Sequence, residues 1–399
     1  MPAISLHGKT CAMPSARLPA FGAPQIDTGV IADHTSGRSH CGGAVDAVVN
    51  HRRRRGRGSA QSFLAADVGG THARIALVRS GGARGSDIEV LAYQRFACSE
   101  HSTLEDLLRA FVETEKARAV RRCVLACAGH VVGDDVVHDN LAWPISLSRL
   151  RGALAFDELV VLNDFEALGY ALADAQHLDA RLLCGPDVHR AGPMLVVGPG
   201  TGLGAAVRVP APAGAFVIAT EAGQVDFAPQ TLREREVLAR LAPDGAYVAC
   251  ERILSGPGLL TLYRTLCALR GEAPTLASPE AVGAAARASD KHAKEAVDLF
   301  CASLGSYVGN LAMTFMAGGG VYLAGGFLFS MFDLLRQSDF ATRFLHGRSV
   351  RAFLERVPVR VMEHGQNGVL GAARFYLERR GLDQVEGSHD GTQSAGVSH

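Results

Sequence analysis

The fold is decided by the stretch Phe63-Leu-Ala-Ala-Asp-Val-Gly-Gly-Thr-His-Ala-Arg-Ile-Ala-Leu-Val78, which predicts an apolar strand, a tight turn and a second strand. The turn is Asp67-Val68-Gly69-Gly70-Thr71, and its paired glycines allow positive φ and close approach to a ligand. Consecutive backbone N–H groups in such a turn form a concave site for an anion. The Asp67 carboxylate beside them suits a hydrated Mg²⁺ near phosphates. The stretch fits either a phosphate-binding turn or an ordinary hairpin.

A second stretch repeats this plan. It reads Met194-Leu-Val-Val-Gly-Pro-Gly-Thr-Gly-Leu-Gly-Ala-Ala-Val207, again an apolar strand, a glycine-rich turn with a threonine, and an apolar strand. The two turns lie about 130 residues apart, which is about the length of one domain. The repeat therefore indicates two related halves, each with a phosphate loop, as a clamp on the phosphates of a nucleotide requires.

Length and composition place the chain among soluble globular proteins. Its 399 residues are enough for two domains, and 48% of them are hydrophobic and 20% charged. The nine cysteines form no CxxC pair, which favours a reducing, cytoplasmic location over disulfides or zinc. The net charge is zero, with +5 in residues 1–60 and −5 in the remainder. The folded part has no basic excess to recruit nucleic acid.

The two ends of the chain differ in composition from the rest. Residues 1–60 are rich in glycine, alanine, serine and arginine, and end in the basic run His51-Arg-Arg-Arg-Arg-Gly-Arg-Gly58. They predict a disordered basic extension, with a nucleic-acid-binding or membrane-surface arm as the alternative. No apolar run typical of a secretory signal is present. A disordered polar tail is predicted at 382–399.

One apolar segment, 311–332, has no charge and is long enough to span a bilayer. It contains the glycine groups Gly318-Gly-Gly320 and Gly325-Gly326. A helix end, a turn, the buried strand Val321–Ala324 and a Gly-Gly turn explain the segment without a membrane.

Apolar periodicity along the chain predicts a mixed α/β protein. The first two strands, 63–67 and 73–78, are completed by a third at 88–95 to form an antiparallel meander. We expect a small α/β domain from 61–174 plus 365–381, and a large α/β domain from 175–364. The other predicted strands are 123–128, 158–162, 321–324 and 357–362, the predicted helices are 104–119, 165–174, 231–241, 259–269, 291–316, 327–335, 338–345, 350–355 and 368–378, and residues 129–135 are predicted as a loop.

Asn163-Asp164 lies where a predicted buried strand meets a helix. Open α/β sheets bind ligands at the carboxyl ends of their strands. A carboxylate there can accept a proton from an attacking hydroxyl, and its low basicity matters little in phosphoryl transfer, where positioning dominates. The alternative is that Asp164 caps the helix that follows.

Two further carboxylates, Glu221 and Glu251, lie in glycine-containing loops. Carboxylates and amides that converge on one cleft suit a polyhydroxyl ligand, because each carboxylate accepts from two hydroxyls. Such polar groups also penalise an analogue that lacks a hydroxyl. Each glutamate taken separately is equally compatible with a solvated surface position.

Six segments together resemble the bacterial glucokinase family, over about residues 62–380. This resemblance implies a two-domain actin-like ATPase (sugar kinase) fold with duplicated strand–turn–strand units and a cleft that closes over ATP and sugar. The segments are Asp67-Val-Gly-Gly-Thr71, Leu162-Asn-Asp-Phe165, Gly198-Pro-Gly-Thr-Gly-Leu-Gly204, Glu221-Ala-Gly-Gln-Val-Asp-Phe-Ala-Pro229, Glu251-Arg-Ile-Leu-Ser-Gly-Pro-Gly258 and Gly319-Gly-Val-Tyr-Leu-Ala-Gly-Gly326.

The resemblance implies ATP-dependent phosphorylation of D-glucose to glucose 6-phosphate. It makes Asp164 the catalytic carboxylate that orients the sugar 6-hydroxyl, and it places Mg²⁺ on the phosphates, with Asp67 reaching the metal through water. It also suggests a homodimer. The implied sugar-binding residues are Asn140, Asn163, Glu221, Gln224 and Glu251, and the implied nucleotide-binding residues are Ala66, Asp67, Val68, Gly69, Gly70, Thr71, Gly200, Thr201, Gly202, Gly325 and Gly326.

Two positions depart from the family pattern. Gln224 stands where the family has a histidine that is expected to hydrogen-bond the sugar, and His72 stands where asparagine is usual. Glutamine can donate and accept hydrogen bonds but cannot be charged. Two alternatives therefore stay open: a kinase for another hexose, and a sugar-binding regulatory protein with weak or no kinase activity.

Overall fold

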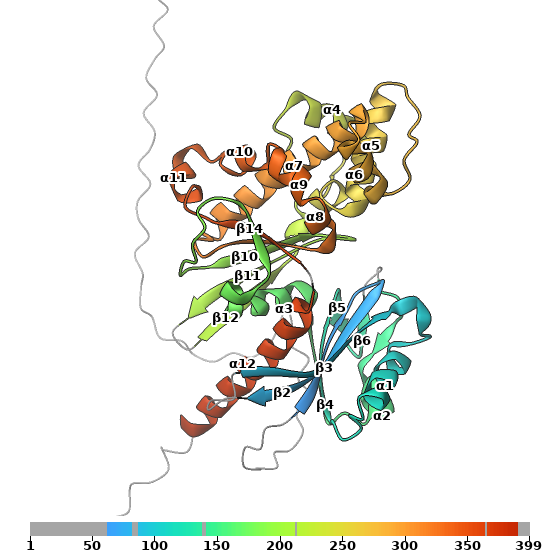
Figure 1. Ribbon diagram of the computed structural model, residues 1–399, viewed down its shortest axis with the longest axis vertical. Coiled ribbons are helices and arrows are strands. Elements are labelled where there is room, and N and C mark those ends of the chain that lie inside the picture. The colour runs from blue at the N-terminus through green and yellow to red at the C-terminus, as the bar shows by residue number, and fades with distance from the viewer. Residues whose placement is uncertain (1–61, 82–86, 138–140, 212–213, 364, 390–399) are drawn as a thin grey trace, which may run out of the picture. The chain divides into compact units, whose positions relative to one another are not determined.

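The computed structural model describes residues 62–81, 87–137, 141–211, 214–363 and 365–389. The predicted basic extension at 1–60 lies outside the described residues. Two large sheets, each with helices against it, form the framework of the described part (Figure 1).

The first sheet has the strand order β3-β2-β1-β4-β8. The strands β3, β2 and β1 form the predicted antiparallel meander, and β4 and β8 continue from β1 in parallel. The strands are β1 (Ser62–Val68), β2 (His72–Gly81), β3 (Asp87–Ala97), β4 (Arg122–Cys127) and β8 (Glu158–Asn163).

Apart from Ser62 and Asp67, strand β1 is apolar because helices cover both faces of its sheet. Its alternate residues Leu64 and Ala66 pack in one core with α1 (Leu104–Thr114) and α2 (Leu147–Leu154). Phe63 and Ala65 point to the other face, where they pack in a core with α12 (Asn367–His389). This division follows the two-residue period of a strand.

The second sheet repeats the plan of the first, with the order β12-β11-β10-β13-β14-β9. Here β12, β11 and β10 are antiparallel, and β13 and β14 continue in parallel. The predicted duplication of the strand–glycine turn–strand unit is therefore present. The strands are β9 (Ala180–Cys184), β10 (Met194–Pro199), β11 (Leu203–Ala211), β12 (Gly214–Thr220), β13 (Gly320–Ala324) and β14 (Val359–Met362).

The helix α3 (Asp164–Ala171) packs between the two sheets. Its Ala167 belongs to the core that contains α12, whereas Leu168 packs with Val196 and Tyr322 of the second sheet. Helix α3 is followed by the short 3₁₀ helix η2 (Leu172–His177). The helix that begins at Asp164 is therefore held by both halves of the fold.

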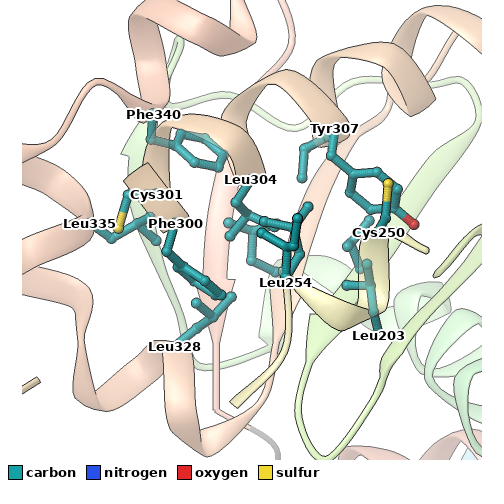
Figure 2. Close-up of a cluster of buried hydrophobic side chains, with 14 of the residues drawn as sticks. Leu203, Cys250, Leu254, Phe300, Cys301, Leu304, Tyr307, Leu328, Leu335 and Phe340 are labelled. Carbon is teal, nitrogen blue, oxygen red and sulfur yellow. The ribbon is translucent and has the colours of Figure 1, made fainter. Parts of the chain in front are cut away.

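Helix α7 (Lys291–Thr314) forms the centre of the largest core, on the outer face of the second sheet (Figure 2). Its Phe300, Leu304 and Tyr307 pack with Leu254 and Leu328. Among the described residues it is the one helix long and apolar enough to cross a membrane, and 78% of its apolar window is buried inside the protein. The other helices of this half are α4 (Leu232–Leu241), α5 (Gly256–Leu269), α6 (Pro279–Arg287), α8 (Gly326–Ser330), α9 (Phe332–Gln337), α10 (Phe340–Phe344) and α11 (Arg351–Leu354).

The uncharged segment 311–332 is divided among several elements. Helix α7 ends at Thr314, β13 occupies Gly320–Ala324, and α8 begins at Gly326. This is the arrangement of helix end, buried strand and glycine turn that the sequence predicts.

Three predictions differ from the structure. The first predicted helix ends at Thr114 rather than 119, because Lys116 takes a left-handed φ of 52°. The predicted loop at 129–135 contains the hairpin strands β5 (His130–Val132) and β6 (Asp135–Val137), which pair with β7 (Ile145–Ser146). The tail predicted to be disordered from 382 continues α12 to His389, since no proline interrupts it and one glycine costs a helix only about 1 kcal/mol. Residues 390–399 lie outside the described part, and the boundary between two domains stays a prediction.

Candidate active site

Three parallel strands of the first sheet end at the same level. Val68 of β1 is paired with Cys127 of β4, and Cys127 is paired with Asn163 of β8. Asp67 and Asp164 flank this row. Burial and, to a lesser degree, the nearby charges of Asp164 and Asp67 raise the pKa of the Cys127 thiol. The two predicted functional aspartates are therefore brought to one edge of the sheet.

The first glycine turn is fixed by backbone hydrogen bonds on both sides. The Gly69 N–H donates to the His72 carbonyl oxygen at 3.0 Å, and the Cys98 N–H donates to the Thr71 carbonyl oxygen at 2.9 Å. Asp67 is buried beneath the turn and pairs with Arg74 at 3.5 Å. Gly70 and Thr71, at the tip of the turn, are exposed.

A cavity of about 300 Å³ opens at this turn. It is bordered by Gly70 and Thr71 on one side and by His101 and Trp143 on another. The Trp143 indole N–H donates to the His101 carbonyl oxygen at 3.1 Å, which holds the ring in place. In contrast, the side chains of Ala66 and Val68 are buried in the core and do not line the cavity.

His72 is held against the turn by its neighbours. Arg95 lies 2.9 Å from its Nε2, and the Thr71 hydroxyl lies 3.1 Å from its Nδ1. Burial and the positive charges of Arg95 and Arg74 lower the pKa of His72. The uncharged ring can therefore accept from Arg95 and donate to Thr71.

Asn163, rather than Asp164, provides the main cap of helix α3. Its Oδ1 accepts from the backbone N–H groups of Phe165, at 2.9 Å, and Glu166, at 3.2 Å. Asp164 is the first residue of the helix, and its Oδ1 accepts from the Phe165 N–H at 2.9 Å. A carboxylate at this end of a helix is stabilised by the helix dipole. The predicted capping role therefore falls mainly to Asn163, which accepts from two helix N–H groups where Asp164 accepts from one.

Phe165 joins Asp164 to the second glycine unit. A Cβ built on Gly204 of β11 would overlap the Phe165 ring, and one built on Gly198 of β10 would lie 2.7 Å from it. The ring thus occupies the space above the two strands that flank the second turn, where a side chain would collide with it. The residue after Asp164 consequently sets the distance between Asp164 and this turn.

The second turn is braced by the loop that contains Glu251. The Gly200 N–H donates to the Gly202 carbonyl oxygen, and the Gly256 N–H donates to the Gly200 carbonyl oxygen, both at 2.8 Å. Glu251, in the 3₁₀ helix η4 (Cys250–Arg252), accepts from the Leu203 N–H at 2.8 Å through Oε2. Thr201 is exposed at the tip. A predicted sugar-binding residue thus contacts a predicted phosphate loop directly.

Gln224 and Glu221 extend this group of contacts. The Gln224 side-chain amide donates to Glu251 Oε1 at 3.3 Å, and the Tyr247 hydroxyl donates to the Gln224 carbonyl oxygen. Glu221, at the start of the 3₁₀ helix η3 (Ala222–Gln224), pairs with His130 at 3.1 Å. Glu221 also borders a second cavity, of about 510 Å³, between its own loop and α7.

The predicted adenosine turn lies beside the end of β10. Gly325 has a φ of 122°, which favours glycine, and a Cβ built there would lie 3.3 Å from the Pro199 carbonyl oxygen. Gly326 begins α8 and is exposed. Because β10 and β13 are parallel neighbours, this turn and the second phosphate turn share one edge of the second sheet.

The structure thus brings together, through contacts, all but one of the predicted site regions. Asn140 lies outside the described residues. Sequence reasoning did not single out Phe165, Cys127 or His130, although Phe165 stands inside one of the six segments that carry the family resemblance. Within the described ranges, no group of three or more His, Cys, Asp or Glu side chains could hold a metal ion. The single buried carboxylate of Asp67 fits a Mg²⁺ that is held mainly by phosphates and water.

Comparison with known proteins decides the family. The family model of glucokinase matches residues 64–379. The chain belongs to the glucokinase family. A glucokinase-like protein of Xylella fastidiosa is 42% identical over 321 residues, which cover 80% of this chain and 96% of that protein. The glucokinase of Saccharophagus degradans is 36% identical and covers 81% of this chain and 98% of its own length.

Solved structures of glucokinases share the fold. A glucokinase from an Antarctic psychrotroph superposes with a TM-score of 0.68 at 29% identity, covering 79% of this chain and 98% of that chain. A ROK family glucokinase from Streptomyces griseus, solved with glucose and AMPPNP, has a TM-score of 0.51 at 20% identity, covering 79% of this chain and 98% of that chain. The architecture is therefore the actin-like ATPase fold of sugar kinases, as the sequence predicts.

Proposed function

We propose that this glucokinase-family chain transfers the γ-phosphoryl group of ATP to the 6-hydroxyl of D-glucose. The observation that carries the proposal is the position of Asp164. It follows the carboxyl end of β8, in the row that ends at the first glycine turn, and its neighbour Phe165 packs on the strands of the second turn. One carboxylate thus lies at the strand edge that carries the first turn and is joined through Phe165 to the strands of the second turn, which suits in-line transfer to a hydroxyl.

The proposed division of work follows from the contacts. Asp164 accepts a hydrogen bond from the attacking hydroxyl and takes its proton as the new O–P bond forms. Its position on a helix held by both sheets fixes that hydroxyl relative to the phosphate loops. Asn163, Glu221, Gln224 and Glu251 bind the remaining hydroxyls, and a carboxylate such as Glu251 has lone pairs left after its contact with Leu203.

The nucleotide is proposed to lie along the two turns. The backbone N–H groups of Gly70, Thr71, Thr201 and Gly202 would donate to phosphate oxygens, and Gly325 would adjoin the adenosine. The N–H groups of Gly69 and Gly200 already donate within their own turns. Asp67 would hold a water of the Mg²⁺ shell, since it is a buried carboxylate directly beside the first turn. Mg²⁺, when bound with ATP, would supply positive charge that stabilises the negative charge developing on the phosphates. A cytoplasmic location and a homodimer remain proposals that accompany this function.

One observation, the glutamine at position 224, favours two other functions. Gln224, which donates to Glu251, stands where the family has a histidine for the sugar. This change can shift the preference to another hexose, because a site rejects a sugar whose hydroxyls leave its polar groups unpaired. It can also accompany a sugar-binding regulator with weak turnover.

A coupled ADP-release assay on a hexose panel distinguishes these functions. The full chain is assayed with ATP, Mg²⁺ and glucose, fructose, mannose or glucosamine, with no sugar as the blank. We expect the highest kcat/KM with D-glucose and little ADP release without sugar. A higher kcat/KM with another hexose would assign that substrate instead. No activity on any hexose by a protein with a normal unfolding transition would favour the regulator.

A further inference from the structure

His130, a residue that the sequence analysis does not place in the site, contacts the proposed sugar-binding residue Glu221. Its Nε2 lies 3.1 Å from Glu221 Oε1, and the two side chains remain 69% and 64% exposed. His130 begins the hairpin strand β5, three residues after β4 ends at Cys127. Glu221 directly follows β12 of the second sheet. The pair therefore links the hairpin beside Asp164 to the loop that carries Gln224.

The His130–Glu221 pair matters because position 224 lacks a histidine side chain. Gln224 offers an amide there, which donates to Glu251 but cannot carry a positive charge. The Glu221 carboxylate instead faces the imidazole of His130, whose Nε2 lies 3.1 Å from Oε1. An imidazole is thus present beside the proposed hydroxyl-binding carboxylates, although it comes from the β5–β6 hairpin and not from the loop itself.

Holding Glu221 has a direct consequence for a polyhydroxyl ligand. When the imidazole N–H of His130 donates to Glu221 Oε1, Glu221 Oε2 stays available to accept from a sugar hydroxyl. An exposed glutamate otherwise samples many rotamers, and fixing it only when the sugar arrives weakens binding. A partner that orients the carboxylate beforehand removes part of that loss.

We propose that His130 is a positioning residue for the hexose, which orients Glu221 and takes the place of the imidazole missing at position 224. This inference rests on the proposed function. It assigns a role in sugar affinity to the β5–β6 hairpin, a segment that the sequence predicts only as a loop. His130 does not take part in phosphoryl transfer, so its removal acts on KM rather than on kcat.

The test compares His130→Ala in two backgrounds. In the native background we expect the KM for glucose to rise about two- to fivefold, as the loss of one exposed ion pair allows, with kcat changed less than twofold. His130→Gln, which keeps a donor, should restore most of the affinity. In a Gln224→His background, His130→Ala should change KM by less than about 1.5-fold, because the imidazole is already supplied from the loop. Val132→Ala, on an exposed side chain of the same hairpin, is the matched control.

Three results would overturn the inference. They are an unchanged KM in His130→Ala, an equal rise in both backgrounds, and a fall in kcat and thermal stability without a change in KM. Glucose binding is also titrated calorimetrically without ATP. If the wild type binds glucose but shows no turnover, the proposed function fails while weakened binding by His130→Ala still supports the role of His130. If the wild type neither binds nor phosphorylates glucose, both fail.

Discussion

The ring of Phe165 lies directly over Gly204, where a side chain on β11 would overlap it. This contact links the residue after the proposed catalytic carboxylate to the strand that leaves the second glycine turn. The two residues come from different halves of the fold, since Phe165 lies in α3, directly after β8 of the first sheet, and Gly204 lies in β11 of the second sheet. The spacing between Asp164 and the second phosphate loop therefore depends on the absence of a Cβ at position 204.

Replacing Gly204 by alanine tests this dependence. The added methyl group must displace Phe165 or β11, and such overpacking costs about 1–3 kcal/mol of unfolding free energy. Because Asp164 moves with Phe165, we expect kcat to fall about tenfold or more beyond any loss of stability. Unfolding by urea and steady-state kinetics measure the two effects.

Gly152→Ala is the matched control for that substitution. Gly152 lies in helix α2 with no atom within 4 Å of a built Cβ. For Gly152→Ala we expect the unfolding free energy to rise by up to about 1 kcal/mol, since alanine has a higher helix propensity than glycine. We expect no change in kcat. Equal kcat values for the two variants would show that the Phe165–Gly204 contact does not position Asp164.

Glu251 connects the sugar loop to the second turn, and its two substitutions separate these roles. Glu251→Ala leaves the Leu203 N–H without its acceptor, so we expect a loss of about 1–3 kcal/mol in unfolding free energy. Glu251→Gln keeps an acceptor and should cost less than about 1 kcal/mol. Both should raise the KM for glucose in the kinetic assay. If Glu251→Gln kept the wild-type KM, Glu251 would brace the turn without binding the sugar.

Most strands of the two sheets could be predicted because their apolar runs are continuous, whereas β9 and β12 of the second sheet were not predicted. Strand β1 is buried on both faces, so nearly every residue of 63–68 is apolar and the pattern is unambiguous. The β5–β6 hairpin was missed for the opposite reason. Its Val132 and Val137 are 63% and 55% exposed, and three-residue strands with outward valines resemble a loop. Strand β12 likewise alternates between partly buried and exposed residues at a sheet edge.

The residues of the candidate site likewise divide into those that the sequence could predict and those that it could not. Asp67, Asn163 and Asp164 were predictable because each directly adjoins the end of a strand. The convergence of Glu221, Gln224 and Glu251 could not be derived from the sequence, since it depends on how two loops meet. The role of Phe165 was hidden because an aromatic residue at the start of a helix usually signals only core packing. His130 was hidden because its partner lies in a distant loop.

The lowered pKa of His72 predicts a pH dependence of stability. Burial, then Arg95 and Arg74, disfavour the charged ring in the folded state. The folded state therefore binds fewer protons than the unfolded state, whose histidine has a pKa of about 6.5. The associated stability is present above that pH and is lost as the pH falls toward the folded pKa. His72→Asn cannot be protonated, so we expect it to lose less stability than the wild type between pH 7 and 5.5.

Thermal unfolding of the two proteins at matched ionic strength measures this difference. The control is His189→Ala, because His189 is exposed. An equal or steeper decline in stability for His72→Asn would mean that His72 is not held uncharged by its surroundings.

Asp164 is proposed to accept the proton of the sugar 6-hydroxyl during phosphoryl transfer. Asp164→Asn keeps the shape and the hydrogen bond to the Phe165 N–H but removes the proton acceptor. General-base groups of this kind contribute about 100- to 10,000-fold to the rate. Asp157→Asn, an exposed aspartate before β8, is the control and should behave as the wild type.

The most direct measurement is therefore kcat for glucose phosphorylation by Asp164→Asn, together with the glucose dissociation constant measured without ATP. We expect a fall in kcat of at least about 100-fold with glucose affinity within about threefold of the wild type. A kcat near the wild-type value, with glucose bound normally, would contradict the proposed role of Asp164.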